Sequence, residues 1–295
     1  MAATYQVRHR TEYVYESEVT SSYGQLHMLP RDVPGQRCRH AEVTIDPAPE
    51  DYRERVDYFG NRVCYLAIHR PHLTLTVTAD SVVEVDDRPD RNSEYLNWPW
   101  ERARDAVATG QVPDPVDAKQ FALDSPLAQA GDAYRGYAVK SFAPQCKLLD
   151  AISSLSSRIH ADFTYKPGST SVTTPLAEAF EQRKGVCQDF AHLGIACLRS
   201  VGLAARYVSG YIETDPPRGG AKLIGVDGSH AWLSVLIPGA GWLDVDPTND
   251  QFVTSRYIVT GYGRDYADVP PMNGVIYTEG KTESLRVLVD VTAIG

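Results

Sequence analysis

The residue with the most evident chemistry is Cys187, which directly follows a glycine turn in the run GVCQDFAH at 185–192. Apolar residues then recur at helical spacing, and a glycine ends the pattern: Phe190, Leu193, Cys197, Leu198, Val201 and Gly202. A thiol in the first turn of a helix lies near unpaired N–H groups and the positive end of the dipole, which lower its pKa and favour the thiolate. Cys187 is therefore a candidate nucleophile, with a small buried hydrophobic residue as the alternative.

A cysteine nucleophile needs a base beside its sulfur and a group that orients that base. His230 has the most suitable setting, because it begins a strand-like run at 229–237 whose other face is wholly apolar. His192 lies about 140° around the helix from Cys187, so their side chains should diverge, and we expect His192 to pack or cap locally. The remaining histidines are expected to lie outside the site: His9, His27, His40, His69, His72 and His160.

The orienting carboxylate is expected from the next strand, where Asp244 and Asp246 share a face and Pro247 ends the ladder. Opposed residues of a hairpin share a face, so a four-residue connection would set Asp246 opposite Leu233, on the wrong side. We therefore expect an odd-length connection, of five residues or with a bulge, that places Asp246 opposite Trp232. Asp244 is the reserve candidate.

A metal site is not expected. Cys187, His192 and Cys197 would not share one helix face, and the chain contains no CxxC pair and no HExxH motif. We predict no cofactor. The net charge of −9 argues against nucleic acid or an anionic membrane as partner, and no apolar run approaches the ~18 residues of a membrane helix. Five cysteines without close pairing, and no signal-peptide pattern, favour a cytoplasmic protein without disulfides.

The period of the apolar residues divides the 295-residue chain into two parts. Alternation over the first eighty-five or so residues predicts β strands, with a hairpin at 58–63 in which Asp57 and Asn61 are assigned to turn chemistry. A helical pattern follows, most clearly at 143–163. Strand patterns return at 205–212, 229–237, 242–246 and 285–291. We predict an N-terminal β domain at 1–95 and a second domain at 96–295.

Three blocks taken together resemble the transglutaminase-like superfamily, in particular its bacterial branch similar to cysteine proteases. These blocks are GVCQDFAH at 185–192, SHAW at 229–232 and DPTN at 246–249, supported by FTY at 163–165, ARYVSGY at 205–211 and GRDYADV at 263–269. The stretch DYFGN at 57–61 resembles the β domain that precedes the core in this branch. The resemblance implies an α+β protein, with a β-sandwich-like N-terminal domain followed by a papain-like, transglutaminase-like core.

The resemblance also implies roles: Cys187 as nucleophile, His230 as base and then acid, and Asp246 as orienter. Cys187 would attack an amide of a protein or peptide substrate and form a thioester. Release by water makes a cysteine protease or amidase, which the branch favours, and release by an amine makes a transglutaminase. A non-catalytic binding module is a further alternative. The backbone N–H of Cys187 is the expected oxyanion donor, with Trp232 and Gln188 as candidates for the second. No acidic loop has calcium-ligand spacing, and the oligomeric state stays open.

Overall fold

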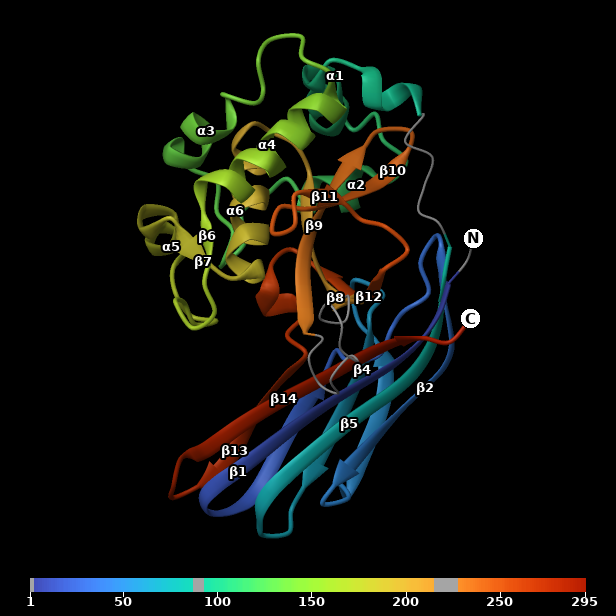
Figure 1. Cartoon of the computed structure of the whole chain (residues 1–295), viewed down its shortest axis with the longest axis vertical. Coiled ribbons are helices and arrows are strands. Elements are labelled where there is room, and N and C mark those ends of the chain that lie inside the picture. The colour runs from blue at the N-terminus through green and yellow to red at the C-terminus, as the bar shows by residue number, and fades with distance from the viewer. Residues whose placement is uncertain (1–2, 87–92, 215–227) are drawn as a thin grey trace, which may run out of the picture.

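The structure is a computed structural model that describes residues 3–86, 93–214 and 228–295. Two bodies are visible in Figure 1, a sheet of long strands and a body of helices around a shorter sheet. Within the described ranges, no helix combines the length and the apolar character needed to cross a bilayer.

The N-terminal body is a seven-stranded antiparallel sheet organised around its first strand. Its strands are β1 (Ala3–Leu26), β2 (Gln36–Asp46), β3 (Asp51–Val56), β4 (Arg62–Ile68), β5 (His72–Val85), β13 (Met272–Thr278) and β14 (Thr282–Ala293). The first half of β1 pairs with β5 and β14, and its second half pairs with β4 and β13. The ladder between β1 and β5 is irregular between Val14 and Val19, where the two halves meet. Apolar residues of β1, β2, β4 and β5 form one buried cluster, so the sheet packs against itself like a sandwich.

The last two strands belong to this sheet, although the sequence-based division places them in the second domain at 96–295. β13 pairs with β1 from Met272 opposite Leu26, and β14 pairs with β1 from Ala293 opposite Tyr5. The strand at 285–291 is recognisable from its alternation, but alternation does not identify the strand beside which it lies. The N-terminal sheet is therefore completed by the C-terminal end of the chain.

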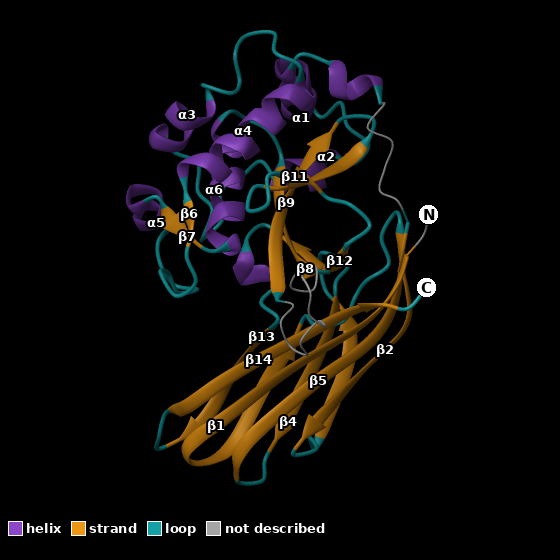
Figure 2. Cartoon of the chain, viewed as in Figure 1, coloured by secondary structure: helices purple, strands orange, loops and turns teal. Residues whose placement is uncertain are grey.

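The second body is built around a five-stranded antiparallel sheet in the order β11-β10-β9-β8-β12. These strands are β8 (Ala205–Ile212), β9 (Ser229–Ile237), β10 (Gly241–Asp246), β11 (Gln251–Phe252) and β12 (Tyr257–Gly263). Its helices are η1 (Glu94–Asn97), α1 (Trp100–Thr109), α2 (Pro115–Gln120), α3 (Asp132–Ala138), α4 (Leu148–Asp162), α5 (Leu176–Gln182), α6 (Cys187–Ser200) and η2 (Tyr266–Asp268). Two short parallel strands, β6 (Thr164–Tyr165) and β7 (Lys184–Gly185), precede α6. Figure 2 shows α3, α4, α5 and α6 gathered on one side of this sheet.

Helix α6 is the central element of the second body, and nearly all of its residues after Gln188 are buried. Leu193 and Leu198 of α6 pack with Leu233 of β9 in the main core cluster. Gly194 lets the helix approach the sheet closely, because a Cβ at this position would overlap the Leu233 side chain. Close packing of α6 on β9 brings the first turn of the helix beside the start of that strand.

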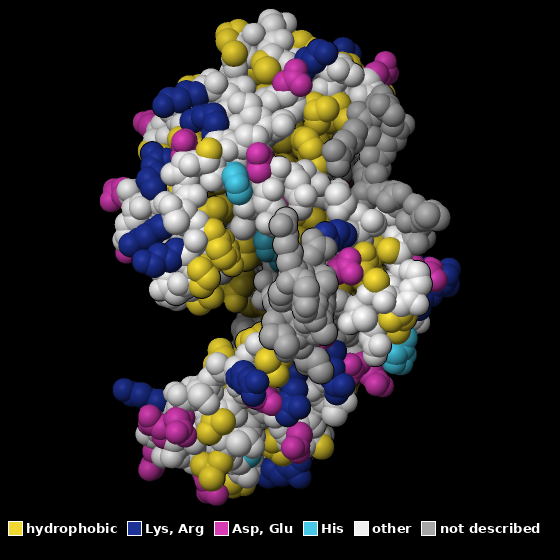
Figure 3. Space-filling view, viewed as in Figure 1, with side chains coloured by type: hydrophobic (Ala, Val, Ile, Leu, Met, Phe, Trp, Pro, Cys, Tyr) yellow, Lys and Arg dark blue, Asp and Glu magenta, His cyan; other side chains and the backbone are white. Residues whose placement is uncertain are grey.

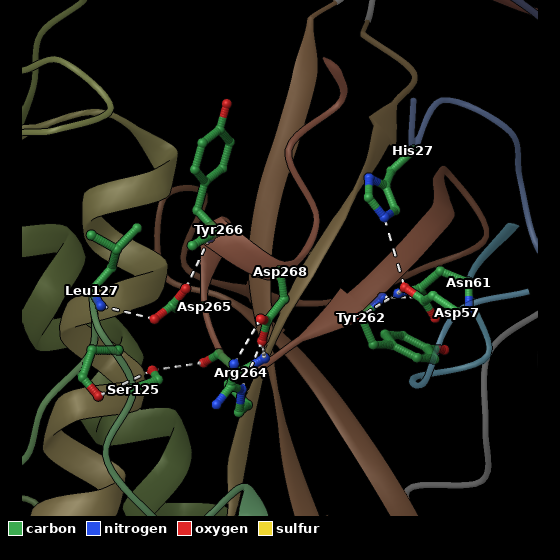
Figure 4. Close-up of polar contacts among 12 residues, drawn as sticks. His27, Asp57, Asn61, Ser125, Leu127, Tyr262, Arg264, Asp265, Tyr266 and Asp268 are labelled. Atoms are coloured by element: carbon green, nitrogen blue, oxygen red, sulfur yellow. Dashed lines mark hydrogen bonds and ion pairs between the residues drawn. The ribbon is translucent and has the colours of Figure 1, made fainter. Parts of the chain in front are cut away.

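A buried asparagine joins the two bodies. Asn61 donates from its backbone and side-chain nitrogens to Asp57 (2.7 and 2.9 Å), which is the expected turn chemistry. Its side chain also donates to the carbonyl of Tyr262 and accepts from the N–H of Tyr262, both at 2.8 Å. Figure 4 shows these contacts between the β3–β4 connection and β12. The local sequence assigns Asp57 and Asn61 to the turn alone, but Asn61 also fixes the sheet against the second body.

Candidate active site

Cys187 is the first residue of α6 and is half-buried. The start of the helix is held by Asp189, whose Oδ2 accepts from the N–H of Val186 (2.8 Å) and from the hydroxyl of Thr170 (2.6 Å). Gly185 must lack a side chain, because a Cβ there would lie 2.7 Å from Oδ2 of Asp189. These contacts set the position of the thiol at the positive end of the helix.

His230 lies at the start of β9 with its ring almost wholly buried. Its Nε2 is 2.7 Å from Oδ2 of Asp246, and the ring stacks on the indole of Trp232, with 6.1 Å between the ring centroids. The side chain of Cys187 lies near enough to the ring to raise the pKa of His230 as well. Burial alone would lower the pKa of His230, but the bonds to Asp246 and Cys187 and their negative charges raise it to about 10. The imidazole is therefore protonated at neutral pH and lies between a thiol and a carboxylate.

Asp246 is fully buried, and both of its carboxylate oxygens accept hydrogen bonds. Besides His230, Oδ2 accepts from the hydroxyl of Tyr257 and from the side-chain amide of Asn249, both at 2.7 Å. Oδ1 accepts from the backbone N–H of Thr248 at 2.8 Å and of Asn249 at 3.3 Å. Burial acts to raise the pKa of Asp246, but the bonds from these donors and the charge of His230 lower it. Asp246 therefore remains ionised within the core.

The register between β9 and β10 selects Asp246 over Asp244. Ile237 pairs with Gly241 and Leu233 with Val245, so the connection is 238–240 and Asp246 follows opposite Trp232. The register and the odd length of the connection are as expected, but the connection has three residues and not five, because the ladder continues for one more pair, from Leu236–Trp242 to Ile237–Gly241. Asp244 lies opposite Ser234 and accepts from its hydroxyl.

Within the described ranges, His192 packs locally and makes no hydrogen bond with Cys187, His230 or Asp246, as its position on the helix predicts. Its Nε2 accepts from the backbone N–H of Tyr266 at 3.1 Å, and its ring lies against Tyr207. Burial lowers the pKa of His192 to about 4, so it is neutral at physiological pH. In the described part of the chain, no group of three or more His, Cys, Asp or Glu side chains is arranged to hold a metal ion.

Two residues of the site were not predicted with a role, Tyr257 and Asn249. Asn249 follows Asp246 by three residues in a turn, a spacing at which Asx side chains and backbone commonly bond, so this contact had a local signal. Tyr257 reaches Asp246 from β12, which is separated from β9 by β8, and no local pattern indicates that meeting. Of the candidate oxyanion donors, Gln188 is half-buried, and the indole N–H of Trp232 is buried without a hydrogen-bond partner among the described residues.

Comparison with known proteins identifies the class. The model of the transglutaminase-like superfamily matches residues 136–247, and that of the bacterial transglutaminase-like N-terminal region matches residues 5–84. The chain belongs to the transglutaminase-like superfamily and carries the bacterial N-terminal region.

Its relatives include proteins of similar length and more distant enzymes. An uncharacterized protein of Mycobacterium tuberculosis is 49% identical over 293 residues, which cover 97% of this chain and 92% of that protein. A protein-glutamine gamma-glutamyltransferase of Pseudomonas aeruginosa is 36% identical over 87 residues, covering 29% of this chain and 13% of that protein. A crystal structure from Cytophaga hutchinsonii, described as a candidate cysteine protease, has a TM-score of 0.75 at 19% identity and covers 100% of this chain and 93% of that chain. The last likeness shows the fold.

Proposed function

We propose that this protein is a thiol-dependent acyl-transfer enzyme in which Cys187, His230 and Asp246 act together on amides of proteins or peptides. The observation that carries the proposal is the position of His230, hydrogen-bonded to a fully buried carboxylate and near enough to the Cys187 thiol for that thiol to raise its pKa. A buried carboxylate is costly unless it is paired, and here its charge is matched by the imidazolium. This arrangement stabilises the proton on His230 and places that cationic ring beside the sulfur of Cys187.

The reaction proceeds in two steps. The thiolate of Cys187 attacks the amide carbonyl carbon, and the oxyanion that forms lies near the N–H groups at the start of α6. His230 gives its proton to the departing nitrogen as the C–N bond breaks, leaving a thioester and a free amine. His230 then takes a proton from the attacking water, and the C–S bond breaks to release a carboxylic acid and the thiol. Asp246 holds the ring orientation and stabilises the imidazolium throughout.

We favour water as the acyl acceptor, and the similarity in fold to the described cysteine protease supports this choice. The second candidate is an amine acceptor, supported by the 87-residue similarity to the protein-glutamine gamma-glutamyltransferase. Both reactions pass through the same thioester, so they differ only in whether water or an amine attacks it. The fully paired buried carboxylate argues against a module that only binds, since binding alone does not require it.

The test is a pair of assays on one preparation of the whole chain. Glutamine-containing peptides are incubated with a labelled primary amine, and mass spectrometry counts both cleaved or deamidated products and amine adducts. The matched controls are Cys187→Ala, which lacks the nucleophile, and Cys146→Ala, which removes another partly exposed thiol. We expect hydrolysis products that vanish only in Cys187→Ala. Amine adducts without hydrolysis would reverse the choice of acceptor, and products that persist in Cys187→Ala would reject the mechanism.

A further inference from the structure

The segment 263–269 is held in place by contacts that involve its backbone and its acidic side chains. The N–H of Tyr266 donates to His192 of α6, and Oδ2 of Asp265 accepts from the N–H of Leu127 at 2.8 Å. The carbonyl of Arg264 accepts from the guanidinium of Arg199 at 2.7 Å. In Figure 4 the ring of Tyr266 points away from Leu127, Asp265 and Arg264. The segment thus fixes the backbone of Tyr266 and leaves its side chain to face elsewhere.

Tyr266 contacts residues that pack on the helix of the nucleophile, since its N–H donates to His192 and its ring meets Tyr207, which lies against His192. It meets the ring of Tyr207 edge-on, with 6.2 Å between centroids, and the charge of Cys187 acts on Tyr207 to raise its pKa. On the other side, burial and then the neighbouring Tyr13 of β1 raise the pKa of Tyr266. Tyr266 is half-buried, and its hydroxyl has no hydrogen-bond partner among the described residues. Tyr266 therefore lies close to the helix that carries the thiol.

A second tyrosine lies next to the nucleophile. Tyr165 of β6 pairs with Gly185, two residues before Cys187, and its ring meets Phe190 of α6 edge-on at 6.4 Å. The charge of Cys187 contributes, after burial, to a raised pKa of Tyr165, and 52% of Tyr165 is exposed. An exposed aromatic ring held beside a thiol offers a flat apolar surface to whatever carries the reacting amide.

The N-terminal sheet continues this apolar surface. Val289 and Val291 of β14 are buried against Tyr211 and Ile258 of the second body. Residues of the same parity further along β14 face the same way but are uncovered, with Leu285 56% and Val287 46% exposed. The apolar face of β14 therefore extends beyond the part that the second body covers.

Tyr13 of β1 belongs to the uncovered part of that face. Tyr13 is directly opposite Leu285, and the two side chains share the face. Figure 3 shows the molecule hollowed between its two bodies, with hydrophobic side chains along the upper wall of the hollow. Because apolar side chains line this hollow and the sheet face at Leu285 and Val287 is left open, the hollow suits an extended chain.

We propose that the substrate is an extended polypeptide segment with apolar side chains flanking the reacting amide, gripped by Tyr165 and Tyr266 and received further along by Tyr13, Leu285 and Val287. This inference rests on the proposed function. The N-terminal sheet is then part of the substrate site. A small amide would touch only the residues nearest Cys187 and would gain nothing from the sheet.

The test compares two peptide sets that share one reacting glutamine, flanked by leucine and phenylalanine in one set and by glycine and serine in the other. We expect wild type to prefer the apolar set at least ten-fold in kcat/KM. Tyr165→Ala and Tyr266→Ala should lose most of that preference because KM rises for the apolar set. The double variant Leu285→Ser with Val287→Ser should lose the preference only for long peptides. Tyr277→Ala, exposed on the outer face of β13, is the matched control and should keep the preference.

The outcomes separate this inference from the function on which it rests. Labelling of Cys187 by iodoacetamide and melting temperatures are measured for every variant, and Tyr165→Phe and Tyr266→Phe, which keep the rings, should retain the preference. Turnover by wild type with the same preference in both alanine variants would overturn this inference alone. Failure of wild type to turn over any peptide, with Cys187 no more reactive than other thiols, would overturn the proposed function and this inference together.

Discussion

The hydroxyl of Tyr257 lies 2.7 Å from Oδ2 of Asp246, the same oxygen that accepts from His230. Tyr257 thus supplies a donor to a charge that is fully removed from solvent. Tyr257→Phe should lower the free energy of unfolding by about 1.5–3 kcal/mol, because a hydrogen bond to a buried charge is lost. Urea unfolding measures this, with Tyr58→Phe, which is 76% exposed, as the control. Equal stability of both variants would show that this bond does not support the carboxylate.

Asp246 and Asp244 are two residues apart on β10, and their contacts predict different effects. Asp246→Asn should lower kcat by about 10⁴, because an amide neither stabilises the imidazolium nor holds the required tautomer. Asp244→Asn should have a far smaller effect, since Asp244 bonds to Ser234. Steady-state kinetics on the same peptide substrate compare the two, and circular dichroism checks that both variants are folded. Similar losses in both would contradict the assignment of the orienting residue.

Cys187 should be the most reactive of the five thiols. Burial is the largest cause raising the pKa of each of the other four: Cys38, Cys64, Cys146 and Cys197. One equivalent of iodoacetamide at near-neutral pH should therefore label Cys187 first, and peptide mapping identifies the site. His230→Gln should slow this labelling about 10- to 100-fold, because the thiolate loses its cationic partner. Labelling of Cys38 or Cys146 at the same rate would remove the main support for a nucleophile.

The proton on His230 predicts how stability depends on pH. Its pKa rises from 6.5 to about 10 in the folded protein, so the folded state holds a proton that the unfolded state releases between these values. The contribution is fully present below pH 6.5 and is lost as pH rises through about 10. The difference in unfolding free energy between wild type and His230→Gln should shrink over this window. Urea unfolding across it provides the measurement, and a constant difference would show that His230 is not held as the cation.

Two glycines in helices predict opposite effects of the same substitution. Gly194→Ala would place a methyl group on the Leu233 side chain and force α6 from β9, at a cost of about 1–3 kcal/mol or more. Gly136 of α3 is exposed, and a Cβ added there would meet nothing within 4 Å, so Gly136→Ala should stabilise by about 0.5–1 kcal/mol. Thermal unfolding distinguishes the two. Because Gly194 lies on the helix that carries Cys187, the first change should also lower activity.

Local pattern was sufficient for much of the candidate site. The glycine before Cys187 and the apolar spacing after it predicted helix α6, and strand parity put His230 and Asp246 on one face of a hairpin. The register argument separated Asp246 from Asp244, even though the expected length of the connection was wrong. These features depend on residues within one or two elements, where the period of the backbone decides which side chains lie together.

Sequence alone therefore determined the helix that carries the thiol, the face of the two strands that carry the imidazole and the carboxylate, and the family. Only the tertiary structure decided that β13 and β14 complete the N-terminal sheet, that Asn61 binds the backbone of Tyr262, and that Tyr257 reaches Asp246. Asn61 and Tyr262 are 201 residues apart. Contacts at such separations depend on which surfaces become buried against each other when the whole chain packs. The spacing of neighbouring residues therefore does not predict them.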